Sequence, residues 1–599
     1  DGSVAFGHRR LSIVDLSPAG HQPMTSRNGA WTITYNGELY NTAEIQGQLG
    51  LTSADLRGHS DTEVLLEAIS RWGVETTVRR VVGMFGFAAY DHQKGDVWLA
   101  RDRFGEKPLY YQAGHDRFAF ASELSAIMSL PGPRPDIDRG ALTLLLRHGY
   151  IPAPHSVFEG VSKLPAGHIL RVTTDGHVSD PVCYWNPIDE ARDAPKRTAS
   201  KHEVIDELEE LLSRTVASRT VSDVPLGAFL SGGIDSSLVV ALMARVSSQP
   251  PRTFTIGFEE TSYDESPFAK RIAHHLGTDH TELIVSESDA LSIVPKLSNI
   301  YSEPFADSSQ IPTRLVSELA RQSVTVALSG DGGDELFAGY SRYQVMRQID
   351  FFKSNFPTWM ARSASFLLEN LGAQALSRVS NSPSVNTPSR QRSASLGRKL
   401  ERIAGALRQE NTTTYESLIS FNFSVKQLVA FEEDSTISDY NFPNFGAPRT
   451  YMLHDTLHYL PEDLLTKVDR ASMSVGLEVR APFLDPDLFR FAHTLPSNMQ
   501  MNRRRGKLVL RGVLARYVPS NLFERPKMGF GVPLGLWLSG PLQLWASELL
   551  DPSTMLSQGY LQSEAVTALW NEHSSGRTDR SAQLWPILMF QSWLNEWAP

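Results

Sequence analysis

The sequence predicts a protein of mixed class, in which an α+β unit is followed by an α/β unit that ends in helices. Residues 1–185 alternate short β-type runs with turns, a pattern typical of a mostly antiparallel sheet with a few helices. After residue 203, apolar runs of strand length alternate with runs at helical spacing, and this alternation predicts a parallel sheet. Residues 341–450 and the residues after about 540 are mainly of helical type.

The composition excludes several classes of protein. A chain of 599 residues with 41% hydrophobic and 21% charged residues is an ordinary globular protein, long enough for several domains. The net charge of −10 argues against a general nucleic-acid binder, and no window is long and apolar enough for a membrane span. The single cysteine, Cys183, suits a reducing compartment. We therefore expect a cytoplasmic protein that binds neither nucleic acid nor membranes.

Four segments follow from these patterns. Residues 1–185 form the first domain, and residues 186–202 are a polar linker containing Pro and Ala. Residues 203–540 form the second domain, and residues 541–599 extend it with helices. Within the second domain, the Ser/Arg/Pro-rich stretch 377–395 predicts a mobile loop.

The first domain begins with runs of strand type. Asn36-Gly37-Glu38 is a turn signal, because Asn-Gly is common in hairpin turns. Ser60 or Asp61 is a candidate cap for the helix that follows. In order, the predicted elements are strands at 5–15 and 31–35, a helix at 64–69, and a hairpin of strands at 85–90 and 97–101 around residues 92–95.

The second domain is organised around the loop at residues 231–237, SGGIDSS. An apolar run at 224–230 predicts a buried strand before it, and residues 238–246 predict a helix after it. Glycines let a ligand approach the backbone, and the N–H groups of a helix start favour phosphate. Asp235 places a carboxylate there too, so a divalent cation is needed to bridge the two anions. The alternative is that Asp235 only caps the helix.

A second loop at residues 329–337, SGDGGDELF, follows another apolar run at 324–328. Its carboxylates suit Mg²⁺, although a solvated acidic turn is the simpler explanation of the loop taken alone. Ligands of parallel sheets bind at the carboxyl ends of the strands, so we expect both loops to face one pocket. The intervening elements are predicted as strands at 253–258 and 281–285, with helices at 265–276 and up to about residue 299.

The motifs of the second domain resemble those of a known family. SGGIDSS is similar to the pyrophosphate loop of N-type ATP pyrophosphatases, and SGDGGDELF resembles the matching loop of asparagine synthetases. The resemblance implies a Rossmann-like adenine-nucleotide α-hydrolase fold, with Asp235 and Asp334 as Mg²⁺ ligands. It also implies that Asp331 assists proton handling and that Lys527 steadies charge as ammonia attacks an adenylate. The implied ATP-binding residues are Leu230, Ser231, Gly232, Gly233, Asp235, Ser236, Ile256, Ser329 and Gly330.

Further stretches also match the synthetases. Residues 463–473 and 478–485 carry Asp, Lys and Arg side chains that are as consistent with structural ion pairs between helices as with substrate contacts.

The first domain resembles class II glutamine amidotransferases in the stretches FGHRRLSIVD, YNGELYN, HSDTEVL, RDRFGEKPLYY and FASELSAI. The resemblance implies an Ntn-type αββα sandwich, truncated here. Arg10 would bind the glutamine α-carboxylate, because a guanidinium fork suits a carboxylate. Glu38 and Asp61 would bind its α-ammonium, and Asn36 and Gly37 would form the oxyanion hole. Each residue taken alone has a structural explanation, as a turn, an ion-pair partner or a helix cap.

One member of the amidotransferase motif is absent. In that family an N-terminal cysteine attacks the glutamine amide, and its own α-amino group acts as base. No cysteine precedes Arg10, and Cys183 is expected to pack as a small hydrophobic residue. Either the chain is a fragment or the protein has lost its glutaminase. Because so much of the pocket motif is present and the chain begins with Asp1 rather than Met, we expect a fragment.

Together the motifs resemble glutamine-hydrolysing asparagine synthetase of the long bacterial type over essentially the whole chain. The resemblance implies aspartate, glutamine and ATP as substrates, Mg²⁺ as cofactor, a β-aspartyl-AMP intermediate, and a homodimer as one option. A paralogue that amidates another carboxylate, such as a sugar acid or cell-envelope precursor, or that closes a β-lactam, remains an alternative. A catalytically inactive binding protein is a third reading, against which Asp235, Asp334 and Lys527 argue.

Overall fold

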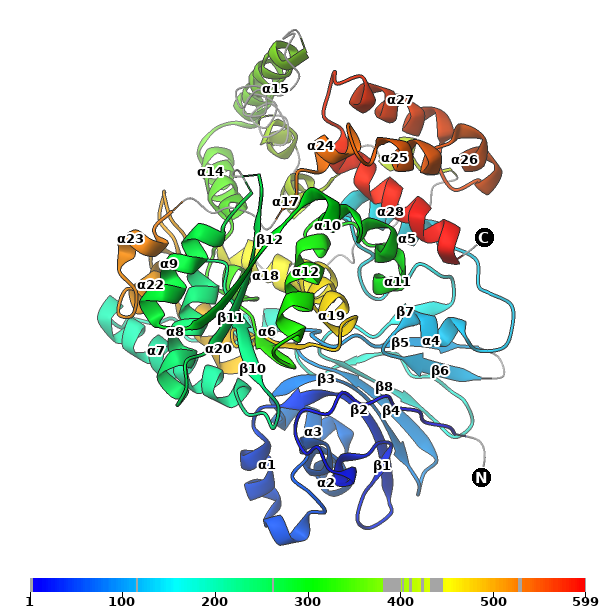
Figure 1. Ribbon diagram of the computed structural model, residues 1–599, viewed down its shortest axis with the longest axis vertical. Coiled ribbons are helices and arrows are strands. Elements are labelled where there is room, and N and C mark those ends of the chain that lie inside the picture. Colours follow the sequence, from blue (N-terminus) through cyan, green and yellow to red (C-terminus); the bar gives the residue numbers. More distant parts are fainter. Residues whose placement is uncertain are drawn as a thin grey trace.

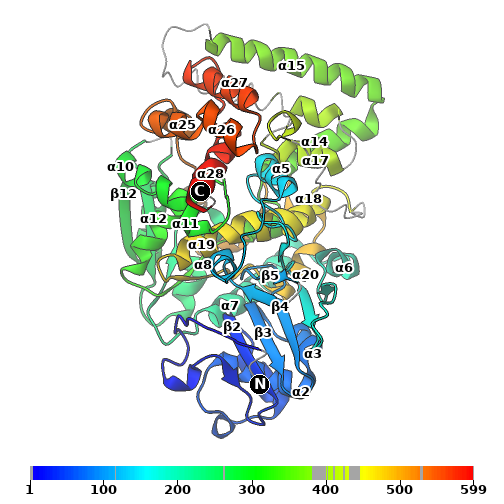
Figure 2. The same ribbon diagram turned by 90° about the vertical axis from the view of Figure 1, so that its right-hand side faces the viewer.

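The computed structural model describes most of the chain, and Figure 1 shows its arrangement. An antiparallel N-terminal unit lies beside a parallel-sheet unit, and helices of the C-terminal third pack against both (Figures 1 and 2). The described residues are 4–114, 117–260, 263–380, 400, 403–408, 412–421, 425–430, 445–525 and 531–597.

The N-terminal unit contains a six-stranded antiparallel sheet in the order β1-β2-β3-β4-β8-β9. The predicted hairpin is confirmed, because β3 and β4 pair around residues 92–95. The predicted turn at Asn36-Gly37-Glu38 is wrong, since these residues lie inside β2 and pair with Gly86, Phe85 and Met84 of β3. The strands are β1 (Met24–Thr25), β2 (Trp31–Leu39), β3 (Gly83–Asp91), β4 (Asp96–Arg101), β8 (His168–Val172) and β9 (Val182–Cys183).

The close pairing of β2 and β3 explains why a glycine stands in this strand. A Cβ atom on Gly37 would overlap the carbonyl oxygen of Met84, so the turn-like dipeptide is used for close backbone approach.

A second, three-stranded sheet of order β6-β5-β7 packs on the first. Leu99, Leu109, Leu164 and Leu170 belong to the buried cluster between the two sheets. α2 (Asp61–Trp72), which begins at the N-cap Ser60, and α3 (Val74–Arg80) cover the outer face of the six-stranded sheet. α4 (Leu124–Met128) and α5 (Arg139–His148) pack beyond the second sheet, so the layers form the expected αββα sandwich. The strands of the second sheet are β5 (Tyr110–Ala113), β6 (Phe118–Ala121) and β7 (Val161–Lys163).

Two expectations for this unit are wrong. Residues 5–15 form no strand, because they run as an irregular segment in which Asp15 has a φ of 59°. Cys183 is exposed rather than packed in a core, because it lies on the edge strand β9, which pairs only with β8 among the described strands.

The segment predicted as a linker contains a helix, α6 (Pro187–Asp193).

The second unit is built on a five-stranded parallel sheet in the order β12-β11-β10-β13-β14. Buried residues of α7 (Lys201–Arg219), α8 (Ile234–Val246) and α22 (Leu508–Leu514) form one core with the sheet. Buried residues of α11 (Leu297–Tyr301) and α12 (Gln310–Arg321) form a second core. The predicted alternation is confirmed, while β14 is an additional strand. The strands are β10 (Leu226–Phe229), β11 (Arg252–Phe258), β12 (Asp279–Val285), β13 (Val326–Leu328) and β14 (Glu478–Arg480).

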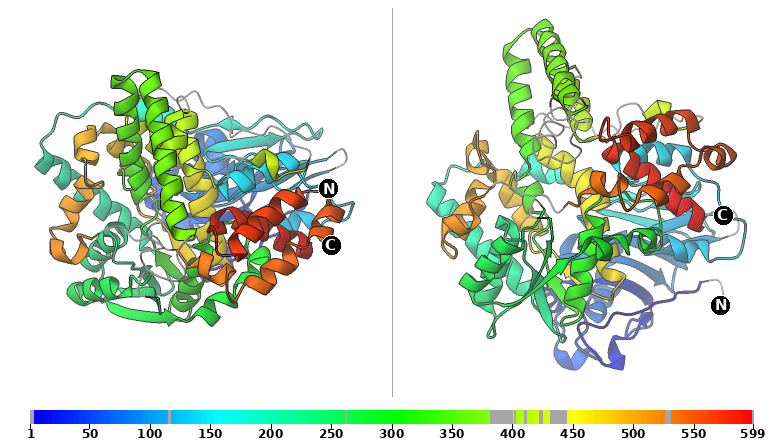
Figure 3. Two further views of the ribbon diagram at one scale, coloured as in Figure 1. Left: turned by 90° about the horizontal axis from the view of Figure 1, so that it is seen from above. Right: turned by 45° about the horizontal axis from the view of Figure 1, so that its top comes forward.

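The described residues after 341 are mainly helical, as predicted for 341–450 and for the residues after about 540. α14 (Ser341–Asn355) and α15 (Thr358–Ser380) project from the body of the molecule (Figure 3). Most of the predicted mobile loop, residues 381–395, lies outside the described residues. No helix in the described part of the chain has the length and apolarity needed to cross a membrane.

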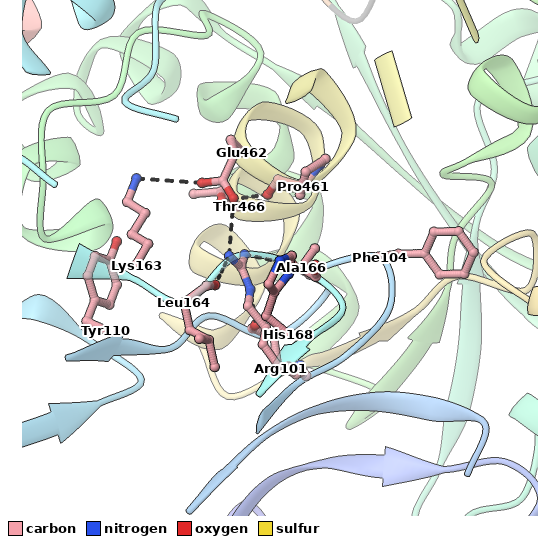
Figure 4. A network of polar contacts seen from close by, with 12 residues as sticks. Arg101, Phe104, Tyr110, Lys163, Leu164, Ala166, His168, Pro461, Glu462 and Thr466 are labelled. Carbon is pink, nitrogen blue, oxygen red and sulfur yellow. Dashed lines mark hydrogen bonds and ion pairs between the residues drawn. The ribbon is translucent and has the colours of Figure 1, made fainter. Parts of the chain in front are cut away.

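Buried ion pairs join the two units (Figure 4). Arg101 of β4 donates to Glu462 at 3.1 Å and to the carbonyl oxygen of Leu164 at 2.9 Å. Lys163 of β7 pairs with Glu303 and lies 3.7 Å from Glu462. Glu462 belongs to η5 (Asp455–Leu465), a π-helix, and π-helical turns are frequently found at functional sites.

The next helix, α19 (Thr466–Met473), adds more ion pairs across the same interface. Lys107 contacts Asp469 at 3.0 Å, and Arg470 contacts Glu123 at 3.2 Å. These two side chains of the 463–473 stretch are therefore structural ion-pair partners.

We expect Arg101→Met to weaken the joint between the units. The substitution leaves Glu462 buried with only the more distant Lys163, and breaking a buried pair costs about 3–5 kcal/mol. Urea unfolding followed by tryptophan fluorescence would show an earlier transition. The matched control is Arg192→Met, which removes an exposed pair with Asp189 and should cost about 0–1 kcal/mol. Equal effects of the two substitutions would contradict a structural role for Arg101.

Candidate active site

The first site loop joins β10 to α8. Gly232 has a φ of 72°, and a Cβ atom there would lie 2.8 Å from the backbone nitrogen of Ala269. Ser231 Oγ accepts the N–H of Gly233 at 3.2 Å and lies 3.0 Å from Ser236 Oγ. Glycine is thus required for the path of this loop, and the hydroxyl groups fix its shape at the start of a helix.

The second site loop follows β13 and leads into α13 (Gly333–Leu336). It touches the first loop, since a Cβ atom on Gly330 would lie 2.8 Å from the backbone nitrogen of Ser236 and 2.9 Å from Asp235 Cβ. The carboxyl ends of the neighbouring parallel strands β10 and β13 therefore bring the two loops together, as their positions in the sequence predicted.

Three charged side chains meet where the loops touch. Lys507 Nζ forms ion pairs with Asp235 and, at 2.6 Å, with Asp334 Oδ1. Burial lowers the pKa of Lys507, but the charges of Asp235 and Asp334 more than offset this and raise it above its usual value. The two predicted metal ligands are thus close enough to share one cation.

Sequence reasoning missed Lys507. It directly precedes α22 and lies far along the chain from both loops. The sequence signal was only a Gly-Lys pair at the start of a helical run, which predicts no charge partner.

A cavity of about 570 Å³ opens in front of these residues. This volume is typical of small-molecule sites. Lys467, which forms an ion pair with Asp307 at 2.6 Å, is also on its wall. Asp331 lines this cavity. So does every residue predicted to contact ATP or the metal: Leu230, Ser231, Gly232, Gly233, Asp235, Ser236, Ile256, Ser329, Gly330 and Asp334.

Lys527 lies outside the described residues. The chain on both sides of it reaches the cavity, which Arg525 and Gly531 line. Arg525 donates to Glu265 at 3.1 Å and to the carbonyl oxygen of Ser231 at 3.2 Å.

A second cavity of about 20 Å³ lies between the two units. Met84, Glu106 and Lys107 line it from the N-terminal unit, and Ser329 and Asp331 line both cavities. Burial, above all, raises the pKa of the Asp331 carboxyl and that of Glu106. Asp331 therefore stands where the small inter-unit cavity meets the large one.

The residues predicted to bind glutamine fall into two places. Asn36, Gly37 and Glu38 lie on β2, and Asp61 begins α2. Asp61 Oδ2 accepts the N–H of Leu39 at 2.9 Å, which ties the helix start to this strand.

Glu38 reaches the second unit through an ion pair with Arg480 of β14 at 3.1 Å. Burial, with the charge of Asp61 next in size, raises the pKa of Glu38, and burial raises that of Asp61. A buried acid whose pKa is raised by a neighbouring acid favours a cation beside it, because the cation offsets both negative charges.

Arg10 lies on a neighbouring loop. Its guanidinium donates to the carbonyl oxygens of Val14 and Asp15, both at 2.8 Å. Asp15 in turn accepts the N–H of His59 at 3.0 Å, two residues before Asp61. The Asn36 amide is 3.5 Å from Ser122 Oγ, longer than a normal N–H···O bond.

Comparisons with known proteins agree with these two units. Residues 1–185 match the glutamine amidotransferase domain family, and residues 207–595 match the asparagine synthase family. Asparagine synthetase [glutamine-hydrolyzing] 1 of Bacillus subtilis is 30% identical over 99% of this chain and 90% of its own. A putative asparagine synthetase [glutamine-hydrolyzing] of Mycobacterium bovis is 33% identical over 99% of this chain and 89% of its own. Amidase chry2 of Gibberella zeae is 26% identical over 94% and 86%, respectively. The chain belongs to the asparagine synthase family and carries a glutamine amidotransferase domain before the synthase domain.

Proposed function

We propose that the protein is an ATP-dependent ligase that converts aspartate to asparagine with nitrogen from glutamine. The acceptor carboxylate would be activated as β-aspartyl-AMP with release of pyrophosphate, and ammonia would then attack the acyl carbon. The observation that carries the proposal is the position of Asp331, which lines both the large cavity and the small cavity between the units. Family membership supports ATP- and glutamine-dependent amidation in general.

The nucleotide half of the proposal depends on the two site loops. The glycines of both loops let phosphate oxygens approach the backbone, and the start of α8 favours negative charge. Mg²⁺ fits the donors present, because it is commonly bound by one or two carboxylates plus substrate phosphates. Asp235 and Asp334 would hold it, since both reach one ammonium group. When bound, Mg²⁺ would offset phosphate charge.

The acceptor half depends on the charges across the cavity. Lys467 and Asp307 form a buried pair on its wall, so both a carboxylate and an ammonium of an amino acid find counter-charges there. Lys527 would steady the charge that develops as ammonia attacks, as a preorganised cation does for an oxyanion. Asp331, whose carboxylate is a stronger base than that of an exposed acid because burial raises its pKa, would take a proton from the attacking ammonia.

The glutamine half depends on the N-terminal unit. Glu38 and Asp61 would bind the α-ammonium group, and Arg10 the α-carboxylate. Asn36 and Gly37 would polarise the amide carbonyl. Ammonia would pass the small cavity lined by Met84 and Glu106 on its way to Asp331.

We expect pyrophosphate release from ATP to depend on aspartate when ammonia is supplied. Asp235→Asn should lower this rate by at least about 10²-fold, because the phosphate and metal site loses a carboxylate. The exposed Asp189→Asn is the matched control and should keep the rate. A screen of other carboxylates in the same assay tests the acceptor. Strong release with a sugar acid and none with aspartate would overturn the proposed substrate.

Lys527→Ala should slow amide formation by roughly 10²–10³-fold while ATP binding changes little, because removing one preorganised donor costs about that much in rate. Ammonia-dependent asparagine formation and nucleotide binding are measured side by side. Lys196→Ala, at an exposed position between the units, is the control. Near-normal turnover by Lys527→Ala would exclude a catalytic role for this lysine.

The 599-residue chain should release no glutamate from glutamine. Cleaving the amide needs a nucleophile with a nearby base. The sole thiol, Cys183, has a pKa raised mainly by partial desolvation at its edge strand, and it hydrogen-bonds only the Trp185 carbonyl among the described residues. Supplied ammonia should then be the nitrogen source of this chain, whereas a chain with a cysteine ahead of Arg10 should use glutamine. The assay is glutamate release, compared with that of Cys183→Ser. Release that persists in the variant would reveal another nucleophile, and release lost in it would assign the role to Cys183.

A further inference from the structure

Lys507 contacts both carboxylates assigned to the metal under the proposed function. Its Nζ pairs with Asp235, and it lies 2.6 Å from Asp334 Oδ1. We propose that Lys507 and Mg²⁺ are alternative counter-ions for Asp235 and Asp334. On this proposal, which rests on the proposed function, Mg²⁺ displaces the ammonium group when it arrives together with the nucleotide.

Electrostatic repulsion makes Lys507 and Mg²⁺ compete for the two carboxylates. Two carboxylates on the wall of a buried cavity repel each other unless a cation lies between them. The Lys507 side chain is only 7% exposed, and the side chains of Asp235 and Asp334 are 16% and 18% exposed, so water screens the three charges weakly. An ammonium and a doubly charged cation cannot both contact the same two oxygens without strong repulsion. The two cations should therefore compete for this place.

The backbone around Lys507 is built to bring the ammonium to this place. Lys507 has a φ of 55°, a left-handed conformation that costs about 1–3 kcal/mol for a residue other than glycine. Its N–H donates to the carbonyl oxygen of Phe337 at 3.1 Å, which anchors it beside the second site loop. Strain of this kind persists where the surrounding contacts hold it, and it is concentrated at functional sites.

Two glycines make room for the lysine. A Cβ atom on Gly339 would overlap both Lys507 Cε and Asp334 Oδ1, and one on Gly506 would overlap the carbonyl oxygen of Ala338. The side chain therefore crosses the chain at Gly339 to reach the acids. An ordinary solvated lysine needs none of these arrangements.

The proposal has a consequence for the order of binding. Mg²⁺ alone would have to expel an ammonium that is already paired, leaving that charge buried without a partner. A nucleotide supplies phosphate oxygens at the same cavity, so the displaced ammonium gains a new anion as the metal enters. Binding of free Mg²⁺ should therefore be weak in the wild-type protein and much stronger when Lys507 is neutralised.

The test is Mg²⁺ binding in the absence of nucleotide, measured by calorimetry and by the thermal-unfolding midpoint. Lys507→Met should bind Mg²⁺ at least ~10-fold more tightly than the wild type, a coupling of ordinary size between competing ligands. Its midpoint should be lower without metal and should rise with Mg²⁺, because a ligand that binds the folded state stabilises it. Lys507→Arg keeps a cation and should bind Mg²⁺ as weakly as the wild type.

The double variant Lys507→Met/Asp334→Asn shows whether the new metal affinity belongs to this site, and it should lose the Mg²⁺ response. Persistence of the response there, or equal Mg²⁺ affinity in wild type and Lys507→Met, would overturn the proposal. If Lys507→Met does not fold, the Mg²⁺ affinity of the wild type still tests the proposal. Tight Mg²⁺ binding by the wild type without nucleotide would contradict competition with Lys507. These readouts do not depend on turnover, so they separate this inference from the aspartate and pyrophosphate assays.

Discussion

The contact between the two loops at the ends of β10 and β13 is the constraint on which the large cavity depends. Gly330 lies against Ser236 and Asp235 with no room for a side chain, so the two acidic loops share one wall. A wider spacing would leave Asp235 and Asp334 as separate surface acids. Because the strands are parallel neighbours, this contact is fixed by hydrogen bonds of the sheet rather than by the loops themselves.

The large cavity depends, second, on the ion pairs that join the two units. η5 carries Glu462, which pairs with Arg101 and Lys163 of the N-terminal unit, and Tyr459 and Leu464, which line the large cavity. One helix thus touches both the ion-pair network and the cavity. Any shift of the N-terminal unit that moves Arg101 acts on the helix that shapes the cavity wall.

The fold and most of the large cavity could be predicted from local signals. The SGGIDSS and SGDGGDELF loops each follow an apolar run, and a parallel sheet necessarily brings such loops to one edge. Asn36-Gly37 was misassigned because the dipeptide favours turns, whereas Gly37 here permits a close strand pair. β14 escaped prediction because three residues carry too little periodicity to detect. Lys507 could not be found, since its partners are set by tertiary packing alone.

The helix α28 (Ser581–Trp597) gives the molecule a particular order of assembly. It packs against α5 of the sandwich and α11 of the synthase domain (Figures 1 and 2), and Trp593 contacts Phe158 at a ring distance of 5.5 Å while donating to the carbonyl oxygen of Ser302 at 3.1 Å. During synthesis the sandwich emerges first and can fold while the ribosome is still adding later residues. The apolar face of the sandwich at Phe158 is covered by α28, which is synthesised hundreds of residues later. Until α28 has been made and has docked, it cannot shield the apolar side chains of this face from water.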